Sequence, residues 1–113
     1  MSKINLYPTD EEAKKMIVEI GRRMYIKNFV AANDGNISCK VGDEVIWTTP
    51  TGVSKGFMSE DDMVKMRLDG TIIKQGARKP SSEVKMHLRI YNERTDIGVV
   101  CHAHPPISSM ALT

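Results

Sequence analysis

The sequence predicts an α/β domain built on a mostly antiparallel sheet. Three observations point to this class: an amphipathic helical pattern opens the chain, two hairpin-like segments follow it, and a second helical segment leads into one more strand. Hairpins outnumber possible strand–helix–strand crossovers, and hairpins join antiparallel strands. With 113 residues, the chain has room for one hydrophobic core.

The first element is predicted to be a helix over residues 10–28. Thr9 is followed by three acidic residues, the last of them Glu12, which is the pattern of a capping box at a helix start. Apolar residues then recur at helical spacing and form one stripe, made of Ala13, Met16, Ile17, Ile20 and Met24.

Two hairpins are predicted after this helix. Residues 36–41 (NISCKV) and 44–49 (EVIWTT) are rich in β-branched residues and flank a turn at Gly42–Asp43. The second hairpin lies in MVKMRLDGTIIK, where Asp69–Gly70 separates two alternating apolar segments. Between the hairpins, Ser59 with the acidic residues after it predicts a short capped helical turn.

A helix, a strand and the start of another helix complete the chain. Ser81 and Ser82 are predicted to open a helix with Val84, His87, Leu88 and Tyr91 on one side. The apolar run IGVVCHAH at 97–104 predicts a strand, and a helical pattern starts at Pro106. Because no capping residue closes this last pattern, we expect Thr113 to lie inside a larger domain.

Composition and charge name no macromolecular partner. The formal net charge of +2 comes from 16 basic and 14 acidic residues without a block of one sign, which argues against nucleic acid and membrane surfaces. No apolar run approaches the roughly 18 residues that span a bilayer, and no secretory signal opens the chain, so a cytoplasmic protein is expected. Cys39 and Cys101 are expected to remain structural thiols.

Two histidines at a predicted strand end are the first candidates for chemistry. His102 and His104 are two residues apart, so both side chains point to one face of a strand with Cα atoms about 6.5 Å apart and can converge on one ion. Two imidazoles make half of a tetrahedral zinc site, so a further ligand is required. The alternative for this pair alone is two histidines bonded to backbone or solvent.

Small polar loops form a candidate anion site. Ser81 and Ser82 place hydroxyls beside the unpaired N–H groups of a helix N-terminus, which suits a phosphate. The segments Gly35–Asn36 and Thr51–Gly52 have the same small polar character. Each of them taken singly also fits a simple cap or turn, and Glu83 is favourable at a helix start whatever else it does.

Four motifs, taken in this order, resemble the N-terminal half of the class II aldolase/adducin family. They are GNIS at 35–38, TPTG at 49–52, KPSSE at 79–83 and VCHAHP at 100–105, and they are closest to the L-fuculose-phosphate aldolase branch. The resemblance implies a three-layer α/β/α fold with a central, mostly antiparallel sheet. It also implies that residues 1–113 are the truncated N-terminal portion of one such domain.

The resemblance further implies a reaction and the residues that perform it. By this resemblance, the phosphate of a ketose phosphate is expected to bind at Gly35, Asn36, Thr51, Gly52, Ser81 and Ser82. His102 and His104 correspond to zinc ligands, and the family's third histidine ligand lies beyond this chain. Glu83 corresponds to the catalytic acid/base of a reversible cleavage that yields dihydroxyacetone phosphate and a small aldehyde. The implied partners are a small phosphorylated sugar and further copies of the chain in a homotetramer.

Other branches of the family leave alternatives open. This chain has SSE at 81–83. At the same position the motif of pentulose-phosphate 4-epimerases resembles SSD, and that of a methylthioribulose-phosphate dehydratase resembles SAE. The glutamate therefore favours an aldolase over an epimerase. Adducin heads resemble the fold without its metal site, so a non-catalytic fragment is the other alternative. His87 follows Glu83 by one helical turn and is expected to pack or support the site rather than bind metal.

Overall fold

The computed structural model describes residues 7–27, 35–54 and 56–102. Its elements are α1 (Asp10–Ile26), β1 (Asn36–Gly42), β2 (Val45–Thr48), the 3₁₀ helix η1 (Glu60–Asp62), β3 (Val64–Arg67), β4 (Ile72–Lys74), α2 (Val84–Glu93) and β5 (Val99–His102). Within this part of the chain the strands form one five-stranded sheet in the order β4-β3-β2-β1-β5. Every neighbouring pair is antiparallel, which confirms the predicted sheet.

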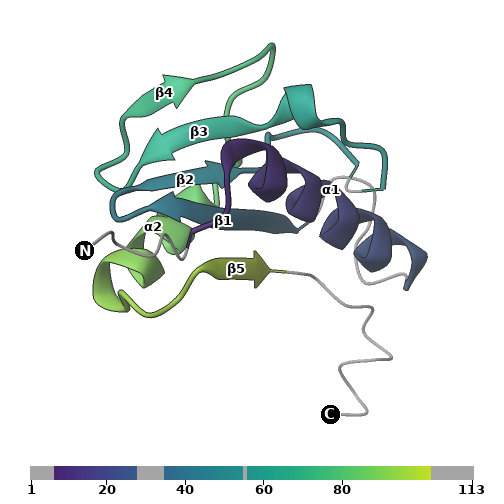
Figure 1. Ribbon diagram of the computed structural model, residues 1–113. Helices are drawn as coiled ribbons and strands as arrows, with labels where there is room; N and C mark the ends of the chain where they lie inside the picture. Colours follow the sequence, from purple (N-terminus) through teal and green to yellow (C-terminus); the bar gives the residue numbers. More distant parts are fainter. Residues whose placement is uncertain (1–6, 28–34, 55, 103–113) are drawn as a thin grey trace.

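The two helices cover opposite faces of this sheet. Figure 1 shows α1 in front of the strands and α2 behind them. Helix α1 packs on the face that carries Ile37 and Cys39 of β1, whereas α2 packs on the face that carries Ile46 of β2 and Met66 of β3. The three-layer α/β/α arrangement is therefore confirmed, with one apolar cluster on each side of the sheet.

The start of α1 has the predicted capping box. The backbone N–H of Thr9 donates to Glu12 Oε1 at 2.8 Å, and the N–H of Glu12 donates to Thr9 Oγ1 at 3.1 Å. The apolar stripe is buried at Ala13, Ile17 and Met24. Met16 is 37% exposed and lies at the margin of the stripe. The helix ends at Ile26, and residue 28, the predicted end, lies outside the described residues.

Both hairpins are present, with a shift in the first turn. The turn lies at Asp43–Glu44, one residue later than predicted, because Gly42 stays paired with Val45 after a register shift in β1. The second hairpin, β3 with β4, is confirmed, and Gly70 in its turn has a φ of 97°. The short helical turn after Ser59 is confirmed as η1.

Helix α2 begins later than predicted, at Val84 rather than at the two serines. The N–H of Ser81 donates to the carbonyl of Thr49 at 3.2 Å, which keeps this segment beside the loop after β2. Ser82 and Glu83 then form the turn that leads into the helix, and Glu83 is its N-cap residue. The predicted inner side is confirmed, with Val84, His87 and Tyr91 buried and Leu88 half-buried.

The last described strand brings the C-terminal motif to the beginning of β1. β5 pairs with β1 so that His102 lies opposite Asn36. His104 and the helix predicted from Pro106 lie outside the described residues. Cys39 and Cys101 are both free thiols, as expected. None of the described helices combines the length and apolar character that a membrane span requires.

Candidate active site

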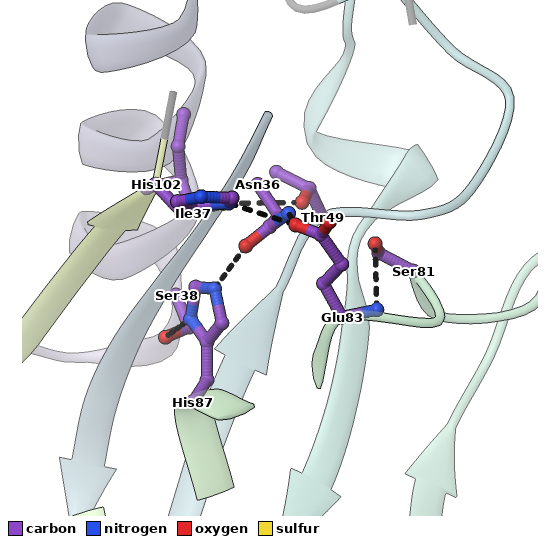
Figure 2. Close-up of polar contacts among 8 residues, drawn as sticks. All are labelled: Asn36, Ile37, Ser38, Thr49, Ser81, Glu83, His87 and His102. Carbon is purple, nitrogen blue, oxygen red and sulfur yellow. Dashed lines mark hydrogen bonds and ion pairs between the residues drawn. The ribbon is translucent and has the colours of Figure 1, made fainter. Parts of the chain in front are cut away.

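Three polar side chains from distant parts of the chain meet at one end of the sheet. Asn36 begins β1, His102 ends β5, and Glu83 immediately precedes α2. The pairing of β1 with β5 brings the first two together, because directly opposed residues of antiparallel strands have Cβ atoms about 5 Å apart. Figure 2 shows the side chain of Glu83 pointing toward both of them.

The carboxylate of Glu83 is the centre of this cluster. Its Oε2 accepts a hydrogen bond from Asn36 Nδ2 at 2.5 Å and lies 2.7 Å from His102 Nδ1. The side chain of Glu83 is 40% exposed, whereas Asn36 is 1% exposed. A buried amide therefore holds the carboxylate from the core side while the carboxylate itself reaches solvent.

The loops predicted to bind phosphate lie beside one another. The N–H of Thr51 donates to the carbonyl of Lys79 at 2.8 Å, and the N–H of Ser81 donates to the carbonyl of Thr49 at 3.2 Å. An antiparallel bridge between Pro50 and Pro80 joins the same two segments. Thr51 and Gly52 are thereby brought next to the segment that contains Ser81 and Ser82.

The small residues in these loops have distinct local roles. Gly35 and Gly52 have φ angles of 88° and 76°, a backbone conformation that residues with a side chain rarely adopt. The hydroxyl of Ser81 accepts from the N–H of Glu83 at 3.3 Å and so fixes the turn before α2. The side chains of Thr51 and Ser82 belong to exposed residues and are available to a ligand.

Arg78 is a residue of this region that the sequence patterns did not single out. A Cβ atom on Gly52 would lie 2.6 Å from Nη1 of Arg78, so the guanidinium packs directly against the candidate phosphate loop. The only sequence signal is a basic residue shortly before the SSE motif, in a segment that otherwise has the composition of a plain loop. Its positive charge favours an anion at this position.

A buried polar network under Asn36 was also missed. His87 Nε2 is hydrogen-bonded to Asn36 Oδ1, and His87 Nδ1 lies 2.6 Å from Ser38 Oγ. Ser38 Oγ in turn lies 2.7 Å from the hydroxyl of Tyr91. His87 is fully buried, so it packs in the core as the sequence analysis expected. Figure 2 shows it on the far side of Asn36 from Glu83 and His102.

Burial sets the protonation states in this network. Desolvation lowers the pKa of His87 to about 4, with His102 adding to the decrease and Glu83 opposing it. Desolvation also raises the pKa of Tyr91 to about 12, although its hydrogen bond with Ser38 acts in the other direction. At neutral pH the network therefore contains a neutral imidazole and a protonated phenol.

The described residues include one of the two histidines expected to bind metal, His102. Among them there is no group of three or more His, Cys, Asp or Glu side chains that could hold a metal ion. His102 has the environment of a ligand, because a metal-binding imidazole uses one ring nitrogen while a carboxylate or carbonyl orients the other, as Glu83 does here. An imidazole nitrogen is a donor of the type that zinc prefers. His104, the other histidine expected to bind metal, lies outside the described residues.

Comparison with known proteins identifies relatives of the chain. Residues 15–113 match the family model for the class II aldolase and adducin N-terminal domain. The chain is 44% identical over 100 residues to an L-fuculose phosphate aldolase of Methanocaldococcus jannaschii, covering 88% of this chain and 53% of that protein. It is 36% identical over 97 residues to a methylthioribulose-1-phosphate dehydratase of Acidiphilium cryptum, covering 86% of this chain and 45% of that protein.

The fold is also found among solved structures. An L-fuculose 1-phosphate aldolase aligns with a TM-score of 0.79 and 27% sequence identity, covering 92% of this chain and 49% of the other. The chain thus spans about half the length of the curated relatives it matches.

Proposed function

The chain belongs to the class II aldolase and adducin family, and from this premise we propose that the protein containing it is a metal-dependent sugar-phosphate aldolase. The reaction is the reversible cleavage of a ketose 1-phosphate similar to L-fuculose 1-phosphate into dihydroxyacetone phosphate and a small aldehyde. The observation that carries the proposal is the carboxylate of Glu83, which lies between Asn36 and His102 beside two small polar loops. By family resemblance the active protein is a homotetramer.

The substrate phosphate is assigned to the loops that lie side by side. Backbone N–H groups at Gly35 and Gly52 and the hydroxyls of Thr51, Ser81 and Ser82 are donors of the kind that bind phosphate. The guanidinium of Arg78 adds positive charge next to Gly52.

Asn36 has a narrower role in phosphate binding than its motif implies. Its carbonyl oxygen and one amide hydrogen are already used by His87 and Glu83. One amide hydrogen of the side chain is left to reach a phosphate. We therefore assign Asn36 mainly to holding the carboxylate of Glu83.

The proposed metal is zinc, held by His102, His104 and a ligand outside this chain. When bound, it supplies a Lewis acid that stabilises the negative charge arising on the substrate during bond cleavage. The contact of Glu83 with His102 Nδ1 supports this assignment, because it orients the ring of a ligating histidine.

Glu83 is assigned to the proton that moves during cleavage. When the C3–C4 bond breaks, the hydroxyl on C4 loses a proton as the aldehyde forms, and the electron pair left on C3 takes up a proton. An ionised carboxylate beside the substrate can accept the proton from the C4 hydroxyl and, once protonated, deliver a proton to C3, and the two transfers run backwards in the reverse reaction. The 40% exposure of Glu83 allows contact with a substrate, while Asn36 holds one oxygen in place.

The SSE motif favours this reaction over the alternatives within the family. The relatives include a dehydratase as well as aldolases. The products of the reaction distinguish these two activities, because an aldolase splits the carbon chain and a dehydratase removes water. A non-catalytic adducin-like role is disfavoured because Glu83 and His102 are in contact.

Glu83→Gln tests the assignment directly. We expect kcat for ketose 1-phosphate cleavage to fall roughly 100-fold or more in the full-length protein, with metal content unchanged, as for loss of an acid/base group. Glu93→Gln, the same change at the exposed end of α2, is the matched control and should leave kcat unchanged. Equal activity in Glu83→Gln and wild type would remove Glu83 from the mechanism.

Ser82→Ala tests the phosphate loops. Because Ser82 is exposed and lies beside the proposed phosphate, its loss should raise KM for the phosphorylated ketose and leave metal affinity unchanged. The unphosphorylated ketose serves as the control substrate, whose weaker turnover should not respond to the substitution. An unchanged KM for the phosphorylated ketose would reduce Ser82 to a turn residue.

A further inference from the structure

We propose that His87 is a positioning residue of the active site, which acts through Asn36 on the carboxylate of Glu83. This inference rests on the proposed role of Glu83 in catalysis. Its basis is a continuous series of buried hydrogen bonds from Tyr91 through Ser38, His87 and Asn36 to Glu83.

The direction of these hydrogen bonds follows from the last acceptor. A carboxylate oxygen can only accept, so the amide NH₂ of Asn36 must face Glu83. The amide oxygen of Asn36 then faces His87, and Nε2 of His87 must carry the hydrogen that it accepts. One ionised carboxylate therefore determines both the orientation of the amide and the tautomer of the imidazole.

The same logic continues into the core. His87 is neutral at physiological pH, since burial lowers its pKa to about 4, so its Nδ1 carries no hydrogen and must accept. The hydroxyl of Ser38 donates to it, and the hydroxyl of Tyr91 donates to Ser38 Oγ. All the hydrogen bonds then run the same way, from Tyr91 toward Glu83.

Burial makes this arrangement rigid. Asn36 is 1% exposed, and Ser38, His87 and Tyr91 are fully buried, so water cannot replace a missing partner. Without a donor at His87 Nε2, the amide oxygen of Asn36 loses its buried partner in this network, and only the contact with Glu83 still orients the amide. The amide can then shift, and the carboxylate that it holds shifts with it.

The position of the network links it to chemistry as well as to folding. Its last member, Glu83, is half exposed and touches His102, the candidate metal ligand. A residue that holds Asn36 therefore also determines where the catalytic carboxylate lies relative to the substrate, and small displacements of such a group reduce turnover.

The first test is the tautomer of His87 in the full-length protein, measured by ¹⁵N NMR of the imidazole nitrogens. The proposal predicts a neutral ring with hydrogen on Nε2 throughout pH 5.5 to 8. A ring with hydrogen on Nδ1, or an imidazolium at pH 7, would overturn it. This measurement needs neither activity nor a substitution, so it tests the hydrogen-bond arrangement at His87 even if the proposed reaction is wrong.

The second test separates positioning from packing. His87→Leu fills a similar volume without a donor, whereas His87→Gln can place an amide N–H near the position of Nε2. We expect His87→Leu to lower kcat roughly 10-fold to 100-fold with KM and metal content unchanged, as for loss of a residue that orients a catalytic group. His87→Gln should recover most of that loss. Equal losses of kcat in the two variants, or wild-type kcat in His87→Leu, would contradict the proposal. Absence of cleavage by the wild type would instead overturn the proposed function.

Discussion

A single amide, that of Asn36, joins the core of this protein to its candidate active site. Its two polar atoms bond His87 on the buried side and Glu83 on the exposed side. The motifs of the sequence predicted that Glu83 and His102 belong to one site, and the structure brings them into contact. They did not predict the network behind it, because Ser38 and His87 are 49 residues apart and neither is unusual in its local pattern.

The buried His87 makes the stability of the fold depend on pH. Its pKa is lowered to about 4 in the folded chain from 6.5, so between these values the unfolded chain binds the additional proton. The contribution of His87 to the free energy of unfolding is therefore complete above pH 6.5. It is lost as the pH falls toward 4, by on the order of 3 kcal/mol.

Denaturant unfolding at pH 7 and pH 4.5 measures this effect. The wild type should lose more stability between the two values than His87→Gln, whose side chain does not titrate. The comparison with the variant removes the contribution of the acidic groups common to both proteins. An equal loss in both proteins would show that His87 is not held neutral in the folded state.

At the scale of elements, β1 serves both faces of the sheet. Ile37 and Cys39 pack under α1, and the residues that alternate with them, Asn36 and Ser38, lie under α2 and bond His87. The alternation of NISCKV predicted the strand correctly. The alternation did not predict that Asn36 and Ser38 are buried, because the polar face of a strand more often faces solvent. These two residues are buried because α2 packs over them.

The capping box of α1 should contribute to stability without contributing to catalysis. Thr9→Ala removes the side-chain acceptor of the Glu12 N–H and is expected to cost about 1 kcal/mol of unfolding free energy. Thr51→Ala in the candidate phosphate loop is the matched comparison, because its side chain is exposed. It should raise KM for the phosphorylated ketose and leave the unfolding free energy nearly unchanged. The reverse pattern would contradict both assignments.

At the scale of the whole molecule, most of the fold could be predicted because its signals are local. Helix caps, alternating strands and turn residues gave the order of elements and the antiparallel sheet. The contact between the Thr51 and Ser81 loops depends on the bridge between Pro50 and Pro80, which no local pattern indicates. The position of Arg78 against Gly52 has the same origin.

The proposed zinc site belongs to the scale of the whole molecule, because no group of three or more metal-binding side chains lies among the described residues. We expect the full-length protein to contain stoichiometric zinc by elemental analysis, and His102→Ala to lose it. His87→Gln is the control, since His87 is buried and bonded through both ring nitrogens. Full zinc content in His102→Ala would remove His102 from the site.

The most direct test of the central claim is product analysis after incubation of the full-length protein with L-fuculose 1-phosphate. The account predicts equal amounts of dihydroxyacetone phosphate and a small aldehyde, formed by wild-type protein and nearly abolished in Glu83→Gln. A product that keeps its carbon chain intact, through loss of water or inversion at C4, would contradict the assignment to carbon–carbon bond cleavage.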